Sequence, residues 1–264
     1  MSKKPAAHIP RKRFGQNFLR DEGVISHIVS AIHPQPADHL VEIGPGQGAL
    51  TDSLVSSGAQ LDVIELDRNL VPGLLAAFSV HRNFKLHSAD ALTFDFSSLV
   101  AANEQLRVVG NLPYNISTPL IFKLLENAGI IRDMHFMLQL EVVQRLAARP
   151  GSKHWGRLGI MTQYHCEVEH LFDVPPEAFD PPPKVRSAIV RLSPWREPKW
   201  PGCKEETLRK VVQAAFAQRR KTLRNNLKGL IDVTRLESLG IDPGARAETL
   251  ELQQFIEMAN STDD

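Results

Sequence analysis

The chain has few cysteines, a balanced charge and no long apolar run. Only Cys166 and Cys203 occur among 264 residues, and neither belongs to a Cys-x-x-Cys pair, so we expect no disulfide framework and no metal site. No hydrophobic run approaches the about 18 residues that a membrane-spanning helix needs. With 42% hydrophobic and 23% charged residues, the composition is typical of a soluble protein. The formal net charge is only +1, so the overall charge does not indicate a nucleic-acid partner.

The most informative motif is residues 111–114, Asn-Leu-Pro-Tyr, which follow an apolar run at 106–110 that is typical of a strand leading into a loop. A carboxamide accepts a hydrogen bond from a planar amine, proline stiffens the backbone and tyrosine offers a flat face for stacking. These groups suit the exocyclic amino group of a nucleobase. Taken alone, the same four residues favour an ordinary turn, but three upstream signals change this interpretation.

Each upstream signal follows a predicted strand. A glycine-rich turn containing Gly44 and Gly46 allows a ligand to approach the backbone closely. Glu65 ends the next apolar run, 21 residues after Gly44, where a carboxylate can accept hydrogen bonds from ribose hydroxyls. Asp90 follows a third run and can accept one from an adenine amino group. Because the carboxyl ends of parallel strands meet at one edge of a sheet, we expect these groups and Asn111 to share one crevice.

Strand-like and helical runs alternate from about residue 38 to 192, which predicts an α/β fold with helices on both faces of a mostly parallel sheet. Asp21 is predicted to cap a helix that carries Val24, Ile25, Ile28, Val29 and Ile32 on its buried side. We expect seven strands, at 39–43, 61–65, 84–87, 106–110, 134–138, 158–166 and 187–192, with one antiparallel edge strand. The predicted divisions are a basic N-terminal arm and lid (1–20), a catalytic domain (21–193), a linker (194–203) and a small helical RNA-binding domain (204–264).

Basic residues are concentrated in two places despite the low net charge. Residues 1–20 contain six lysines and arginines and no acid. Residues 211–228 contain five and no acid, which predicts a helical face that neutralises phosphates rather than a merely solvated helix. The proposed RNA contacts are Arg11, Lys12, Arg13, Arg219, Arg220, Lys221 and Arg224.

Together these motifs closely resemble the ribosomal RNA adenine N6-dimethyltransferases over nearly the whole chain. The similarity includes Arg-Lys-Arg-Phe-Gly-Gln-Asn-Phe-Leu at 11–19, Asn-Ile-Ser-Thr-Pro at 115–119, Phe-Asp-Pro-Pro-Pro-Lys-Val at 179–185 and Gln-Arg-Arg-Lys-Thr-Leu-Arg at 218–224. It is strongest to the bacterial members that dimethylate two adjacent adenines near the 3′ end of small-subunit ribosomal RNA. One departure is Leu140, where the family often has lysine before the glutamate.

The resemblance implies a Rossmann-like methyltransferase fold that uses S-adenosylmethionine, and it implies roles for particular residues. Asn111 and the carbonyl of Leu112 would accept the two N–H groups of the target amine, Pro113 would fix the turn and Tyr114 would stack on the adenine. Phe179 is a candidate for the opposite face of that base, and a core aromatic is an equally good interpretation. The implied cofactor residues are Gln16, Asn17, Leu19, Gly44, Gly46, Glu65, Leu66, Asp90, Ala91 and Asn111.

Alternatives remain open at this point. Gly-x-Gly-x-x-Ala at 44–49 with Glu65 also satisfies the dinucleotide fingerprint of nicotinamide dehydrogenases, but that assignment leaves residues 111–114 and the basic tail unexplained. The other two alternatives are a large-subunit ribosomal RNA adenine dimethyltransferase and an assembly factor that acts mainly by binding RNA. We expect a cytoplasmic monomer whose partner is small-subunit ribosomal RNA in an immature small ribosomal subunit, with no membrane and no metal.

Overall fold

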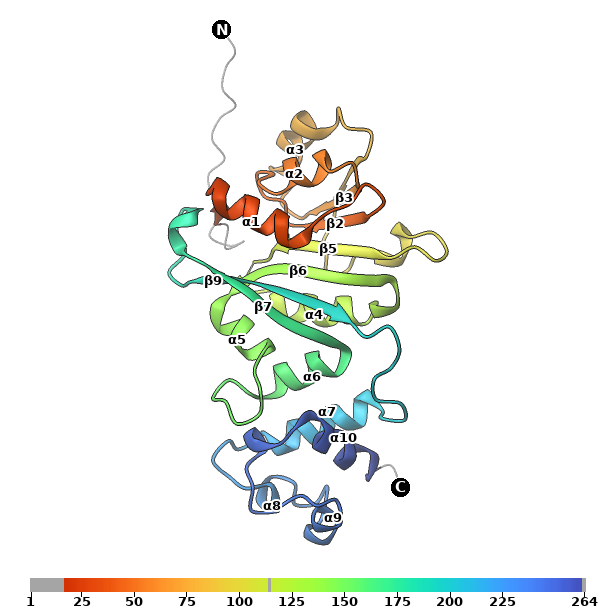
Figure 1. The fold of residues 1–264 in the computed structure, drawn as a ribbon, viewed down its shortest axis with the longest axis vertical. Helices are drawn as coiled ribbons and strands as arrows, with labels where there is room; N and C mark the ends of the chain where they lie inside the picture. Colours follow the sequence, from red (N-terminus) through yellow and green to blue (C-terminus); the bar gives the residue numbers. More distant parts are fainter. Residues whose placement is uncertain (1–16, 114, 263–264) are drawn as a thin grey trace. The chain divides into compact units, whose positions relative to one another are not determined.

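The computed structural model describes residues 17–113 and 115–262 (Figure 1). The chain divides into two compact units, and each is described by itself. The first contains the described residues up to Leu140 together with Glu169–Pro194, and the second contains Glu141–Val168 and the described residues from Trp195 onwards. This division differs from the predicted catalytic domain at 21–193, because residues 141–168 belong with the C-terminal part.

A seven-stranded sheet with strand order β4-β3-β2-β5-β6-β9-β7 forms the frame of the fold. Its strands are β2 (His39–Ile43), β3 (Gln60–Glu65), β4 (Phe84–Ser88), β5 (Leu106–Asn111), β6 (Ile131–Gln139), β7 (Cys166–Val174) and β9 (Ser187–Pro194). The β3–β4, β2–β3, β2–β5 and β5–β6 pairs are parallel, and β6–β9 is antiparallel. The predicted mostly parallel, seven-stranded sheet is confirmed. The prediction of an antiparallel edge strand was wrong, because β9 lies between β6 and β7.

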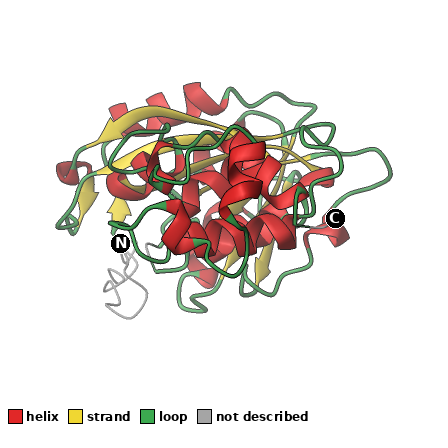
Figure 2. Ribbon diagram, turned by 90° about the horizontal axis from the view of Figure 1, so that it is seen from below, coloured by secondary structure: helices red, strands yellow, loops and turns green. Residues whose placement is uncertain are grey.

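Helices connect the parallel strands, and Figure 2 distinguishes the helices from the strands by colour. Those of the first unit are α1 (Glu22–Ile32), α2 (Thr51–Ser56), α3 (Val71–Phe78) and α4 (Ser117–Leu125), with 3-10 turns η2 (Phe96–Leu99), η3 (Ala128–Ile130) and η4 (Pro176–Ala178). No helix among the described residues has both the length and the apolar character needed to cross a membrane.

Helix α1 begins where the sequence predicts. The Asp21 side chain accepts a hydrogen bond from the Val24 amide at 2.9 Å, which satisfies one of the free donors of the first turn. Ile25, Ile28 and Ile32 are buried at helical spacing in the core that α1 shares with the sheet. The predicted cap and the three isoleucines of the buried face are therefore confirmed, whereas Val24 and Val29 are only partly buried against that core.

A second, two-stranded sheet joins distant parts of the sequence. Strand β1 (Phe18–Leu19) pairs antiparallel with β8 (Phe179–Asp180), so that Leu19 faces Phe179. The backbone amides of Arg20 and Asp21 extend this contact by donating to the Ala178 carbonyl at 2.8 and 3.2 Å. The segment just before α1 is thereby fixed to the first unit.

The second unit is helical, as the periodicity from Lys204 predicts. Its elements are most of α5 (Leu140–Leu146), then α6 (Arg157–His165), α7 (Glu205–Ala215), α8 (Leu223–Asn226), α9 (Val233–Ser238), η5 (Ala247–Thr249) and α10 (Leu252–Asn260). The strand predicted at 158–166 was wrong, because residues 157–165 form α6. The Trp155 indole donates to the Leu250 carbonyl at 2.9 Å, and this bond ties the segment before α6 to the C-terminal helices.

Candidate active site

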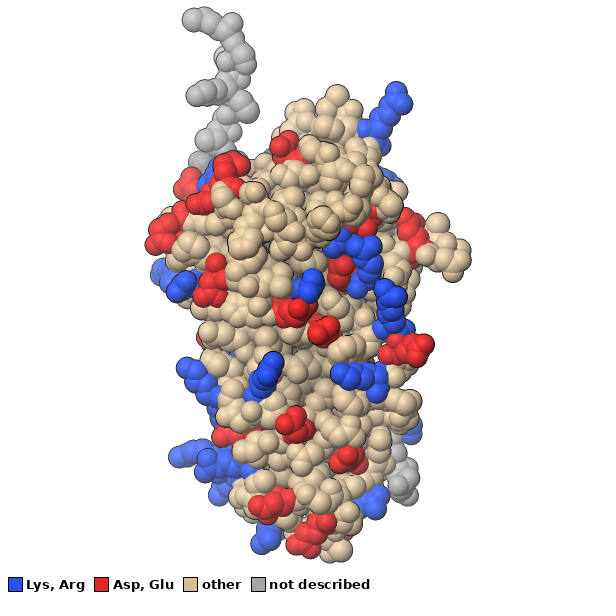
Figure 3. All heavy atoms as spheres, in the orientation of Figure 1, with Lys and Arg blue, Asp and Glu red and all other residues tan. Residues whose placement is uncertain are grey.

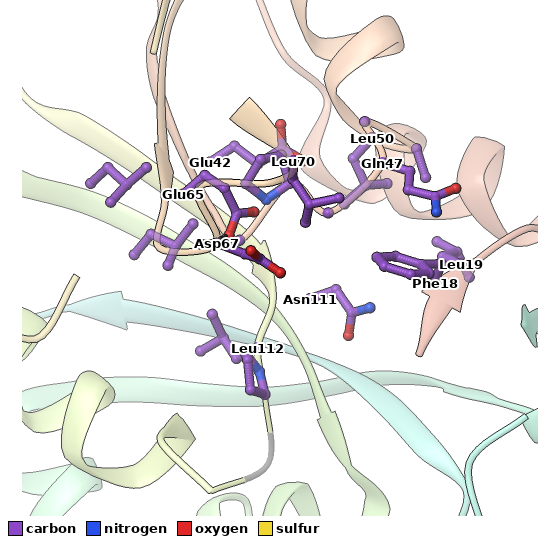
Figure 4. A pocket seen from close by; sticks show the side chains of 18 of the residues that line it. Phe18, Leu19, Glu42, Gln47, Leu50, Glu65, Asp67, Leu70, Asn111 and Leu112 are labelled. Carbon is purple, nitrogen blue, oxygen red and sulfur yellow. Dashed lines mark hydrogen bonds between the residues drawn. The ribbon is translucent and has the colours of Figure 1, made fainter. Parts of the chain in front are cut away.

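A cavity of about 390 Å³ opens at the carboxyl ends of the parallel strands, within the usual range of small-molecule sites. Its position agrees with the general rule for open α/β sheets. Figure 4 shows acidic, amide and aromatic side chains that converge on it from β1, the glycine turn and strands β3 and β5. All of its lining residues belong to the first unit.

The glycine-rich turn forms one wall of the cavity and requires glycine for two reasons. Gly44 and Gly46 have φ values of 67° and 60°, in the left-handed region that favours glycine. The ring of Phe18 also lies against Gly46, where an added Cβ atom would be 3.1 Å from it. The sequence predicts that a ligand approaches the backbone of this turn closely. Phe18 of β1 therefore occupies part of the space beside Gly46.

Glu65 lies at the end of β3, as predicted, and lines the cavity with a side chain that is almost wholly buried. It accepts the Asp67 amide at 2.7 Å. Burial raises the pKa of Glu65, hydrogen bonds from the backbone of Asp67 and Gly46 act in the opposite direction, and the Asp67 charge adds to the increase. Leu66, which also lines the cavity, is 50% exposed and so offers an apolar wall to a bound ligand.

Glu42 is a cavity residue to which the sequence analysis gave no role. The residue is 2% exposed, and its carboxyl group accepts a hydrogen bond from the Thr51 hydroxyl at 2.6 Å. Burial raises the pKa of Glu42 to about 7, and the nearby charge of Glu65 contributes. The signal in the sequence was a carboxylate inside the otherwise apolar run at 40–43. Further lining residues to which the sequence analysis gave no role include Gln47, Asp67, Asn115 and Ile116.

Asp90 and Ala91 follow β4 and line the same cavity, as predicted. The Asp90 side chain accepts the Leu92 amide at 2.9 Å, which fixes the turn after the strand. Ala91 is buried and contributes a small apolar surface.

Asn111 is the last residue of β5, and Leu112 and Pro113 carry the chain along the cavity. The Asn111 amide nitrogen donates to the Asn17 carbonyl at 3.4 Å. The Leu112 amide donates to the Met137 carbonyl at 3.2 Å, and the Pro113 carbonyl accepts the Ile116 amide at 3.1 Å. These two hydrogen bonds fix the backbone at 112–113, which includes the Leu112 carbonyl that is predicted to accept from the target amine. Tyr114 lies outside the described residues.

The lid segment lines the cavity through Asn17, Phe18 and Leu19, and Arg20 donates to Gln47 on the glycine turn at 2.5 Å. Gln16 lies outside the described residues. Phe179 is buried in the core, which agrees with one of its two interpretations, and it also lines the cavity. Its contact with the target base stays a prediction.

The described basic residues that were predicted to contact RNA do not line this cavity. Arg11, Lys12 and Arg13 lie outside the described residues. Arg219, Arg220 and Lys221 occupy a turn between α7 and α8, so the predicted helical face was wrong for them, and Arg224 alone lies on a helix. Arg219 donates to Glu248 at 3.1 Å and to the Lys153 carbonyl at 2.7 Å.

A parallel sheet that contains one antiparallel strand, with a glycine turn after β2 and an acid at the end of β3, defines the class of Rossmann-like methyltransferases. The comparisons agree with this class. The solved 23S rRNA methyltransferase ErmE is 30% identical, with a TM-score of 0.76, and the match covers 94% of this chain and all of that one. A dimethyladenosine transferase from Plasmodium falciparum, 24% identical over 91% of this chain and 95% of its own, has the same fold with a TM-score of 0.79.

Sequence comparisons give the family. The model for ribosomal RNA adenine dimethylases matches residues 7–264. Ribosomal RNA small subunit methyltransferase A of Pseudomonas aeruginosa is 62% identical over 253 residues, 96% of this chain and 94% of its own. The protein of that name from Saccharophagus degradans is 57% identical over 254 residues, 96% and 95% of the two chains. The chain belongs to the ribosomal RNA adenine dimethylase family, and the resemblance noted from its motifs is confirmed.

Proposed function

We propose that this protein uses S-adenosylmethionine to dimethylate N6 of two adjacent adenines near the 3′ end of small-subunit ribosomal RNA. The observation that carries the proposal is that Asn111 lines the same cavity as the glycine turn and Glu65. A carboxamide that can accept from an amine therefore lies beside a site suited to a nucleoside. The relatives named for the small subunit are 57–62% identical, whereas the one named for 23S RNA is 30% identical, which favours the small subunit.

The charges of the cavity support the choice of cofactor. Its lining contains six acidic residues and one basic residue, Arg20; the acids are Glu22, Glu42, Asp52, Glu65, Asp67 and Asp90. An acidic site favours a ligand that carries a sulfonium and an ammonium group and disfavours the pyrophosphate of a dinucleotide. The glycine turn and Glu65 fit the nucleoside part of this cofactor. The dehydrogenase alternative is correspondingly weakened.

Residues of this chain would orient the reacting amine. When bound, the cofactor supplies an electrophilic methyl group on its sulfonium sulfur. Asn111 Oδ1 and the Leu112 carbonyl accept the two N–H groups of the adenine amine, which directs the nitrogen lone pair at that methyl group. Asn111 and Leu112 would hold the amine in this orientation while it gains the methyl group, and the amine proton would leave to water. No strong base is needed, because the main requirement is orientation.

The partner would be the RNA of an immature small ribosomal subunit, contacted by a monomer in the cytoplasm through the basic turn at 219–221 and Arg224. On the face in Figure 3, basic and acidic side chains are interspersed, and the proposed phosphate contacts belong to the local cluster at 219–224. Arg220, Lys221 and Arg224 are exposed.

The test is to incubate the protein with labelled S-adenosylmethionine and small subunits that lack these methyl groups, then to digest the RNA to nucleosides. We expect labelled N6,N6-dimethyladenosine in the small-subunit RNA. Label in large-subunit RNA alone would favour the 23S alternative. No label in either RNA, with cofactor binding intact, would favour an assembly factor that acts by binding.

A further inference from the structure

The Asn111 carboxamide lies between a main-chain carbonyl and the cavity. Its nitrogen is 3.4 Å from the Asn17 carbonyl oxygen. In Figure 4 the nitrogen of Asn111 lies toward Phe18 and Leu19, and the oxygen points away from them. Among residues 17–113 and 115–262, no protein donor contacts Asn111 Oδ1, so this oxygen is available to a ligand.

The chemistry of the neighbour determines which half of the amide faces the lid. A carbonyl oxygen can only accept a hydrogen bond, so the NH₂ half must face Asn17. The reversed amide would place two oxygens at the same distance and would present a donor to the cavity. A donor at that point would meet the N–H groups of an adenine amine, where an acceptor is required.

The position of the Asn17 carbonyl depends on the docked lid. The next residue, Phe18, begins β1, which pairs with β8. The Phe18 ring rests on Gly46, and the Arg20 amide donates to Ala178 at 2.8 Å. The carbonyl is therefore fixed relative to β5 by contacts on both sides of the cavity.

The geometry assigns the main-chain carbonyl of Asn17 as a positioning group for methyl transfer. It holds the Asn111 amide in the orientation that presents Oδ1 to the target amine. This inference rests on the proposed function, and it adds that the lid contributes to orienting the substrate as well as enclosing the cofactor.

The pH dependence of an Asn111→Asp variant tests the requirement for a donor. Its new carboxyl group can donate to the Asn17 carbonyl and still accept from adenine only when it is protonated. We expect the ratio of variant to wild-type single-turnover rates to fall about tenfold per pH unit above the pKa of that carboxyl group. A ratio that is constant or rises between pH 5 and 9 would overturn the inference, because a carboxylate would then serve equally well.

Two amide-to-ester replacements test the role of the Asn17 carbonyl directly. They also test the inference if the aspartate variant has no measurable rate. Replacing Phe18 by its α-hydroxy acid makes the Asn17 carbonyl an ester, which is a weaker acceptor. The same replacement at Leu19 weakens the Phe18 carbonyl instead and is the matched control, since each removes one amide of β1. We expect the first ester alone to lower kcat about three- to tenfold, with the cofactor Kd changed less than twofold.

A measurement on the protein without substrate separates this inference from the proposed function. In protein labelled with ¹⁵N-asparagine, the Asn111 side-chain signal is identified by its loss in Asn111→Asp. The Phe18 ester should shift this signal and speed its hydrogen exchange, and the Leu19 ester should not. Equal effects of the two esters on the signal and on kcat would overturn the inference, whereas failure of the wild-type protein to methylate RNA would overturn only the proposed function.

Discussion

Gly110 faces the carbonyl oxygen of Ile43 on the neighbouring strand so closely that a Cβ atom at residue 110 would lie 2.5 Å from that oxygen. Strands β2 and β5 pair in parallel with Glu42 opposite Val109, so this contact lies one residue before Asn111. The close approach keeps the glycine turn and the predicted catalytic loop side by side.

Gly110→Ala should therefore lower the free energy of unfolding by about 1–3 kcal/mol, because the strands must separate to admit the methyl group. Urea unfolding measures the change. Gly73→Ala in α3 is the matched control, since nothing lies within 4 Å of its added Cβ atom, and it should be neutral or stabilise by up to about 1 kcal/mol. Equal destabilisation by the two substitutions would contradict the steric argument.

The buried carboxyl group of Glu42 should make stability depend on pH. Its pKa rises from 4.5 to about 7 on folding, so the folded protein holds a proton that the unfolded chain releases. This contribution is complete below pH 4.5 and is lost as pH rises through 7, a change of up to about 3 kcal/mol. Glu42→Gln should remove this part of the slope in urea unfolding curves measured from pH 4.5 to 8. An identical slope in the variant would show that Glu42 does not carry it.

Asn111→Ala should reduce methyl transfer by orders of magnitude and leave RNA binding nearly unchanged. The reason is that the substitution removes the acceptor for the target amine but no phosphate contact. Single-turnover methylation and filter binding measure the two effects. Near-normal turnover would remove Asn111 from the proposed chemistry.

Arg220→Ala combined with Lys221→Ala should weaken RNA binding and reduce the salt slope by about 1–2, the loss of two phosphate contacts. Arg219 is left intact because it pairs with Glu248 and the Lys153 carbonyl. The control is Arg209→Ala with Lys210→Ala in α7, whose side chains pair with Glu205 and Glu206. If the slope is unchanged in the first double variant, the turn is only a solvated surface.

The sequence predicted best the elements whose signals are local. Apolar runs located β2 and β5, and the Asp21 cap with its isoleucines located α1. The apolar run at 158–166 indicated a strand, but Leu158, Ile160 and Met161 are buried in α6, which packs against α7 and α10 from distant parts of the sequence. Strand β7 is buried only at its ends, Cys166 and Val174, and the residues between them are partly or fully exposed, so it gave a weaker apolar signal.

The candidate site was predictable where a glycine or polar residue directly follows or ends a predicted strand, as for Gly44, Glu65 and Asn111. Glu42 was missed because a carboxyl group inside a strand acquires its environment from Thr51 and Glu65, which other elements supply. The insertion of β9 between β6 and β7 depends on pairing over many residues, and no local pattern encodes it.

The pairing of β1 with β8 also imposes an order on assembly during synthesis. Residues 18–19 leave the ribosome about 160 residues before residues 179–180, with which they pair. A nascent chain that already contains the glycine turn, Glu65 and Asn111 still lacks the strand that holds the lid. The first part of this site to be translated is thus the last to dock. A nascent chain shorter than about 180 residues should therefore bind the cofactor weakly.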